Sequence, residues 1–117
     1  MNLDKYQALA NRTAKSLPTA IDDLMHAQIG MTTEVGEFAT TLKKMSIYGQ
    51  PMTVEKRNNL IEELGDLLWY VALAATALHV PLDVVAQHNV DKLMERYPDK
   101  YSDELAAARL DKNGAED

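Results

Sequence analysis

Proline and glycine residues divide this helix-rich chain into five segments, and this punctuation limits its possible folds more than any other feature. The breaks fall at Pro18, Gly49, Pro51, Pro81, Pro98 and Gly114. No segment between them alternates apolar and polar residues over the length of a strand, as a half-buried strand would. The sequence therefore predicts an all-α fold, a bundle of four to five helices. We expect helices near residues 3–16, 19–46, 53–79, 82–97 and 102–111.

The length of 117 residues suits one domain with its own core and is too short for two independent domains. We expect this single domain to cover residues 1–111. Residues 112–117 are expected to form a frayed C-terminal tail.

Composition narrows the possible settings and partners. The chain has no cysteine, which excludes disulfides and thiol nucleophiles, and no charged-then-apolar leader precedes Leu3, so we expect a cytoplasmic location. No apolar run approaches the roughly 20 residues that span a bilayer, so we expect no membrane partner. The net charge of -6 disfavours a polymeric nucleic acid, which is bound by a concentrated Lys/Arg surface.

Apolar residues recur at helical spacing in the second and third predicted helices. One row is Met31, Val35, Phe38, Leu42 and Met45, and the other is Leu60, Leu64, Leu67, Val71 and Leu78. Such rows are the buried faces of amphipathic helices, so we expect them to pack against each other. The third helix also carries Trp69, Leu73 and Ala77 on its opposite side, which the other helices can cover only in part. We therefore expect a second subunit to cover the rest.

The two long helices repeat one acidic pattern, Glu34-Val35-Gly36-Glu37 and Glu63-Leu64-Gly65-Asp66. Residues three apart lie on one side of a helix, so the two carboxylates of each pair repel each other. This repulsion weakens the helix that carries them. A divalent cation with oxygen ligands supplies the missing counter-charge. A single pair of this kind is more often a solvated surface. The matched repetition favours a metal site made of Glu34, Glu37, Glu63 and Asp66.

Two neighbouring features refine this hypothesis. Gly36 and Gly65 stand inside helices, where glycine costs roughly 1 kcal/mol relative to alanine, so we expect the two backbones to approach closely there. Glu62 lies four residues before Asp66 and could reach the same face. We rank Glu62 below Glu63, because only Glu63 aligns with Glu34 in the repeated pattern.

The fourth predicted helix places Asn89, Lys92 and Arg96 on one face. Alone, such cations are solvated side chains at a helix C-terminus, where they complement the dipole. Beside a metal site they are candidate phosphate clamps. The three histidines share no spacing with the carboxylates and receive no role. Thr40 and Trp69 stand where a ferritin-like di-iron bundle needs histidine, which argues against redox iron chemistry.

These segments together resemble the MazG-type all-α nucleoside triphosphate pyrophosphohydrolases, in their compact single-domain form. The family's mark is Glu-x-x-Glu followed by Glu-x-x-Asp, and the resemblance extends through Gly36-Glu37-Phe38, through residues 62–70 and through residues 89–98 with their Arg-Tyr-Pro ending. It implies hydrolysis of a nucleoside triphosphate between the α and β phosphates, giving a monophosphate and pyrophosphate. It also implies a role in maintaining the nucleotide pool, and homodimers or dimers of dimers.

The resemblance also implies roles for the matched residues. The four carboxylates would hold magnesium, or manganese, and Glu37 is our choice to help deprotonate the attacking water. Lys92 and Arg96 would steady the leaving pyrophosphate. Asn89 would bind phosphate or sugar, and Tyr70 the base or sugar. Nothing in the sequence selects a base, and Trp69 is more often a core residue than a stacking platform.

A second hypothesis comes from another functional class. The chain would then be a non-catalytic helical module whose carboxylates bind metal only to stabilise an oligomer or to bind a partner. That hypothesis accounts for the bundle but gives no role to Lys92 and Arg96. Release of pyrophosphate in a metal-dependent assay distinguishes the two.

Overall fold

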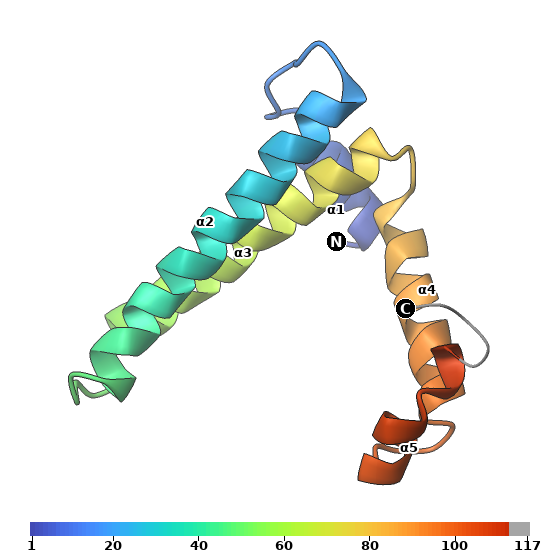
Figure 1. The fold of residues 1–117 in the computed structure, drawn as a ribbon. Helices are drawn as coiled ribbons and strands as arrows, with labels where there is room; N and C mark the ends of the chain where they lie inside the picture. The colour runs from blue at the N-terminus through green and yellow to red at the C-terminus, as the bar shows by residue number, and fades with distance from the viewer. Residues whose placement is uncertain (113–117) are drawn as a thin grey trace. The chain divides into compact units, whose positions relative to one another are not determined.

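The computed structural model describes residues 1–112 and shows a chain built from helices alone (Figure 1). The elements are α1 (Leu3–Asn11), α2 (Ala20–Ser46), α3 (Val54–Ala77), α4 (Leu82–Arg96), α5 (Asp103–Ala108) and the 3-10 turn η1 (Leu110–Lys112). No strand occurs within residues 1–112, which confirms the all-α prediction. Residues 1–82 form one compact unit and the residues from Asp83 onward a second, and each unit is described by itself.

Short polar side chains start four of the five α-helices found in residues 1–112. In each case the side-chain oxygen of the N-cap residue accepts a hydrogen bond from the backbone N–H three residues further on, which satisfies a donor that the helix itself leaves free. The N-cap residues are Asn2, Thr19, Thr53 and Ser102. This chemistry explains why the predicted starts at residues 3, 19, 53 and 102 fall within one residue of the observed ones.

The first helix is shorter than predicted, ending at Asn11 rather than residue 16. Thr13 turns the chain here, because its backbone N–H and its hydroxyl both donate to the carbonyl oxygen of Ala10, at 3.0 and 2.7 Å. The indole N–H of Trp69 donates to the same hydroxyl at 2.9 Å. A contact from a distant helix thus fixes the turn, and nothing in the local sequence signals it.

The third helix ends two residues earlier than predicted, at Ala77. His79 takes the left-handed conformation with φ 56. Its N–H donates to the carbonyl of Thr76, and the N–H of Val80 donates to that of Ala75. This is the hydrogen-bond pattern of a Schellman motif, in which glycine is the usual residue. The prediction missed it because histidine occupies the glycine position.

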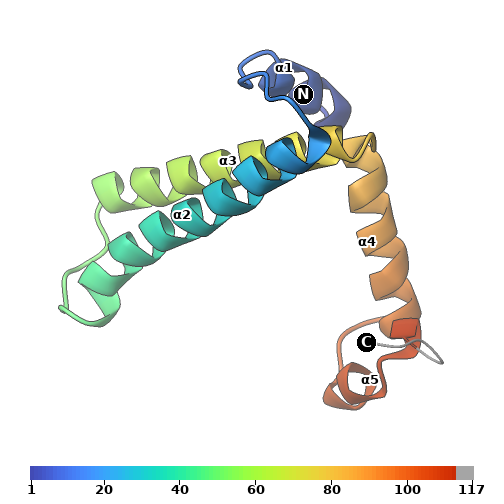
Figure 2. The ribbon, with the colours of Figure 1, turned by 45° about the horizontal axis from the view of Figure 1, so that its top comes forward.

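Helices α2 and α3 lie side by side and antiparallel in both views of the ribbon (Figure 1, Figure 2). The connection between them includes Gly49, whose φ of 68 favours glycine. Helix α1 packs on the C-terminal half of α3. A small core gathers there from Ala10, Ala72, Ala75 and Leu82, with Leu3, Tyr6, Trp69, Val71 and Val80 packed against it.

The predicted apolar rows are buried only in part: Leu60 is buried and Phe38 and Leu67 are half-buried, but other members are exposed. Val35 is 55% exposed and Leu64 is 53% exposed, and Leu42 and Leu78 are also exposed. The residues of these helices that are buried include Ala27, Gly30, Thr41 and Glu63. Small and polar residues are therefore buried alongside Leu60 of the predicted row. The prediction assumed that the most apolar row must face inward, and it is wrong at these four leucine and valine positions.

The opposite side of α3 was predicted to be covered only in part by the other helices. Leu73 is buried and Trp69 is half-buried. Residues of α1 and the turn after it, including Ala10 and Ala14, line the same small depression as these two side chains. Large apolar side chains that stay exposed on α2 and α3 include Ile29, Val35, Leu42, Ile61, Leu64 and Leu68.

An ion pair joins the end of α4 to η1 within the second unit. Arg96, the last residue of α4, donates from Nε and Nη2 to the two carboxylate oxygens of Asp111, the second bond measuring 3.0 Å. The Asp111 side chain is only 1% exposed. The guanidinium group lowers the pKa of Asp111 below its ordinary value through this hydrogen bond. Lys112 belongs to η1, and the rest of the predicted frayed tail lies outside the described residues.

Within residues 1–112 no single helix is both long enough and apolar enough to cross a membrane. The broken pair α3 and α4 meets that test of length and composition when its two helices are taken together.

Candidate metal centre

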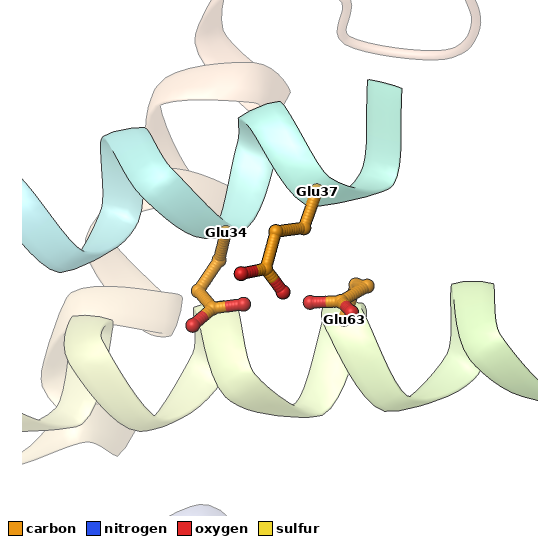
Figure 3. A group of neighbouring side chains, drawn as sticks. All are labelled: Glu34, Glu37 and Glu63. Carbon is orange, nitrogen blue, oxygen red and sulfur yellow. The ribbon is translucent and has the colours of Figure 1, made fainter. Parts of the chain in front are cut away.

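Three of the four predicted metal ligands meet between α2 and α3 (Figure 3). Glu34 and Glu37 extend from neighbouring turns of α2, and Glu63 extends from α3 toward them. Each offers a carboxylate oxygen, and these oxygens all lie within 4.8 Å of one another. The antiparallel packing therefore brings the two acidic motifs together, as the repeated pattern predicted.

Two oxygens of this carboxylate group have no hydrogen-bond partner among the described residues. Glu63 is 7% exposed and Glu34 is half-buried, and in each the Oε2 atom is buried without a donor from that part of the chain. A buried polar atom without a partner costs free energy, more so when it carries charge. Hard divalent cations such as magnesium and manganese take carboxylate oxygens as ligands. The donor set and its unpaired oxygens fit such an ion.

The crowding of carboxylates changes their proton affinity. The negative charge of Glu63 raises the pKa of Glu37 above its ordinary value, and a hydrogen bond with Glu63 adds to the effect. The pKa of Glu63 is also raised, first by a hydrogen bond with Glu34 and then by burial. Repulsion among like charges, partly withdrawn from water, favours the neutral form. Without a cation, Glu37 and Glu63 hold protons more tightly than isolated glutamates do.

Asp66, the fourth predicted ligand, is not part of the group within 4.8 Å that the described residues form. It lies one turn beyond Glu63 on α3 and lines an open pocket of about 380 Å³ together with Glu34, Trp69 and Tyr70. Its charge contributes to the raised pKa of both Glu37 and Glu63. Asp66 therefore adds negative potential to the group, and its role as a ligand stays a prediction.

A short polar chain supports Glu63 from the other side. The hydroxyl of the buried Thr41 donates to Oδ1 of Asn59, and Nδ2 of Asn59 lies 3.5 Å from Oε1 of Glu63. Sequence analysis missed both residues, although the signal is present. Thr41 follows Glu37 by one turn and Asn59 precedes Glu63 by one turn, so both share the face of the carboxylates. Glu62 is exposed.

The glycines that approach a neighbour are not the predicted ones. A Cβ atom added at Gly36 or at Gly65 would meet nothing within 4 Å in the part of the chain that the structure describes. These glycines face open space, because the acidic pairs and not the residues between them face the opposite helix. The close approach occurs instead at Gly30, where a Cβ atom would lie 2.1 Å from Cε1 of Tyr70. The predicted close contact at Gly36 and Gly65 is therefore wrong.

Three aromatic rings form a cluster at the end of the carboxylate group nearer Asp66. The rings of Trp69 and Tyr70 are 5.0 Å apart and nearly perpendicular, and His26 of α2 lies edge-on to Tyr70 at 5.7 Å. Edge-to-face packing of this kind is a favourable geometry for aromatic side chains. Trp69 is thus both part of the packing on α1 and a wall of the pocket beside Asp66. Sequence analysis assigned no role to His26, and the structure places it in this cluster.

A second open pocket, of about 440 Å³, lies beyond Asn59 near the α2–α3 connection. Its walls include Lys44 and Lys56 as well as Thr41 and Asn59, with Glu55 as the acidic member. Nζ of Lys56 donates to the carbonyl of Pro51 at 2.9 Å. The carboxylate group therefore lies between an aromatic pocket and a pocket with two cations.

The three predicted residues of α4 lie in the second unit. Asn89 and Lys92 are exposed, and Arg96 is engaged by Asp111. The ion pair uses Nε and Nη2, so Nη1 carries further donors. Asn89, Lys92 and Arg96 stay predicted substrate-binding residues, because the second unit is described by itself.

Comparisons with known proteins agree with these motifs. The family model described as the MazG nucleotide pyrophosphohydrolase domain matches residues 24–101. Among curated proteins, the chain is 39% identical over 102 residues to the Gene 37 protein of Mycobacterium phage L5, which covers 82% of this chain and 89% of that protein. No solved structure matches the chain significantly.

Proposed function

The chain belongs to the MazG nucleotide pyrophosphohydrolase family, and from this membership we propose that it hydrolyses nucleoside triphosphates between the α and β phosphates. The products are a nucleoside monophosphate and pyrophosphate. The family generally has this class of activity and depends on divalent metal. We propose magnesium as the ion, with manganese as a substitute, and maintenance of the nucleotide pool in the cytoplasm as the role.

The observation that carries the proposal is the carboxylate group with its two unpaired buried oxygens. Glu34, Glu37 and Glu63 would hold the ion, with Asp66 as a further ligand. A divalent ion held there would neutralise charge on the phosphate oxygens and make the attacking water more acidic. A purely structural cluster of this kind has no reason to leave charged oxygens buried and unpaired.

We propose the remaining roles from the resemblance of the motifs to those of the family. Glu37 is the exposed member of the group, so we assign it to accept the proton of the attacking water. The water oxygen bonds to phosphorus, the α–β anhydride bond breaks, and the electron pair leaves with pyrophosphate. Lys92 and Arg96 would steady the departing charge. Tyr70 would contact the base or sugar in the pocket beside Asp66, and Asn89 the phosphate or sugar.

We further propose that the chain works as a homodimer or as a dimer of dimers. Ile61, Leu64 and Leu68 are exposed along one side of α3, and Val35 and Leu42 are exposed on α2. Exposed apolar rows on a helix pair are candidate interfaces between copies of a chain. Leu64→Lys should therefore reduce the mass measured by light scattering. Ile21, at the exposed start of α2, provides a control lysine substitution outside these rows.

Product analysis tests the reaction itself. Phosphorus NMR of a panel of ribo- and deoxyribonucleoside triphosphates should show pyrophosphate as the first product in the presence of magnesium, and the panel would identify the preferred base. Orthophosphate as the first product, or full turnover in excess chelator, would contradict the proposal. If no nucleotide is hydrolysed but metal still binds, the alternative of a metal-stabilised oligomerisation or partner-binding module takes its place.

A further inference from the structure

Gly30 is the glycine of α2 with the tightest surroundings. It is buried in the α2–α3 interface, directly against the ring of Tyr70. A Cβ atom at this position would lie 2.1 Å from Cε1 and 2.3 Å from both Cδ1 and Cζ of that ring. Real Cβ atoms do not approach other atoms this closely, so the ring occupies the space of the missing side chain.

The same ring is fixed on its other sides. Trp69 lies edge-on to it with centroids 5.0 Å apart, and His26 does so at 5.7 Å. Trp69 is itself held by its hydrogen bond to Thr13. Tyr70 therefore has Gly30, Trp69 and His26 as close neighbours, and enlargement of Gly30 must displace its ring.

Tyr70 also forms a wall of the pocket that contains Glu34 and Asp66. Its ring thus has two functions, as packing against α2 and as a surface beside the carboxylate group. A displacement of the ring away from Gly30 changes the shape of this pocket without touching a carboxylate. The pocket of about 380 Å³ falls within the size range of small-molecule sites.

We propose that Gly30 is a positioning residue that fixes Tyr70 as the wall of the nucleoside-binding pocket, and that it thereby sets which nucleosides fit. This inference rests on the proposed function, since it takes the ligand of the pocket to be the nucleoside part of the substrate. The phosphates of the substrate would be held by the metal centre, so the position of Tyr70 should not affect their binding. Bulk at position 30 should therefore weaken the binding of a nucleoside triphosphate and leave the binding of inorganic tripolyphosphate unchanged.

The experiment measures equilibrium binding, so it does not depend on turnover. Trp69 is the single tryptophan of the chain and lies against Tyr70, so its fluorescence reports the pocket directly. Wild type, Gly30→Ala and Gly36→Ala are titrated with non-hydrolysable α,β-imido nucleoside triphosphates and with tripolyphosphate, all with magnesium. Gly36 is the matched control, a glycine inside the same helix whose added Cβ atom meets nothing within the described residues.

We expect Gly30→Ala to raise the dissociation constant of the nucleotide about tenfold, in line with the effect of one methylene group in a binding pocket. The constant for tripolyphosphate should stay unchanged, as should both constants in Gly36→Ala. In the Tyr70→Leu background, which gives the added methyl group room, Gly30→Ala should have no further effect on nucleotide binding. This background also keeps the test valid if Gly30→Ala alone fails to fold.

Two results would overturn the inference. The first is a nucleotide dissociation constant in Gly30→Ala equal to that of wild type. The second is that Gly30→Ala lowers nucleotide affinity by the same factor in the Tyr70→Leu background as in the wild-type background. Failure of the proposed function looks different. In that case the wild-type protein releases no pyrophosphate from any nucleoside triphosphate, while the dependence of nucleotide binding on position 30 still appears and supports the role of Gly30.

Discussion

Two regions of the first unit, the contact of α1 with α3 and the acidic motifs near the middle of α2 and α3, are built on opposite principles. Where α1 meets the C-terminal part of α3, polar groups are paired. The side-chain amide of Gln7 donates to Oγ1 of Thr76 and to the carbonyl of Val80, each at 3.1 Å, and its oxygen accepts the N–H of Leu82 at 2.7 Å. Where α2 faces α3 at the acidic motifs, like charges lie together and two buried oxygens have no partner within residues 1–112. The paired polar groups stabilise the fold. The crowded carboxylates destabilise it, and a bound cation would offset this loss.

This contrast predicts that substitutions in the two regions act in opposite ways. In the carboxylate group, the loss of a side chain should abolish activity and spare stability. Where α1 meets α3, the loss of a side chain should lower stability.

The largest effect is expected at the carboxylates. Replacing Glu34, Glu37, Glu63 or Asp66 by alanine should lower the rate of pyrophosphate release at least about a thousandfold, because the charge stabilisation of the transition state is lost. Glu62→Ala is the control and should keep measurable activity. The metal-free variants should melt at or above the wild-type temperature, since removing a carboxylate relieves repulsion. A large loss of stability in each would instead make these residues structural.

Gln7→Ala tests the region where α1 meets the C-terminal part of α3. It removes three hydrogen bonds and leaves the carbonyl of Val80 and the N–H of Leu82 without their partner. We expect a loss of about 2–3 kcal/mol in the free energy of unfolding, measured by urea denaturation. Gln28→Ala, at an exposed position of α2, is the matched control and should change little. Equal stabilities for the two variants would remove the contrast between the α1–α3 contact and the carboxylate group.

A smaller effect, of the opposite sign, is expected at Gly36. Alanine there gains about 1 kcal/mol of helix propensity, and its Cβ atom meets no described residue within 4 Å. Gly36→Ala should therefore raise the melting temperature. A fall in the melting temperature would show that the assembled protein fills this space, and would revive the predicted close approach at this glycine.

The smallest effect concerns pH. A glutamate whose pKa is raised in the folded state favours folding while protonated, and this contribution is lost as the pH rises from the ordinary glutamate pKa through the raised one. The metal-free wild-type protein should therefore lose stability relative to Glu37→Gln between about pH 4 and neutrality. Thermal melts of the two proteins across this range measure the difference. A constant difference would show that the pKa of Glu37 is not raised.

Some of this architecture was predictable because its causes are local in the sequence. Helix starts follow from side chains such as Thr19 and Thr53, which cap the first turn through a bond three residues long. The acidic group follows from spacing and from its repetition in two helices. Helix ends were harder to predict. The end of α1 depends on a bond from Trp69, 56 residues away, and the end of α3 uses histidine where glycine is usual.

The rotation of α2 and α3 about their own axes could also not be predicted from the sequence. The prediction put both apolar rows entirely inward, but only Leu60 of them is buried, and small and polar residues such as Gly30 and Thr41 are buried as well. Hydrophobic burial alone favours Val35 and Leu64 in that place. Which glycine accommodates a partner depends on this rotation, so Gly30 could not be distinguished from Gly36 by sequence pattern.

The central claim is that the carboxylates of α2 and α3 hold a divalent cation, and calorimetric titration with manganese tests it without any substrate. Wild type and Glu62→Gln should bind manganese alike, with release of protons because the raised pKa values of Glu37 and Glu63 leave protons to displace. Glu63→Gln, which keeps the size of the side chain but not its charge, should lose at least about tenfold in affinity. Equal affinities for Glu63→Gln and wild type would contradict the account.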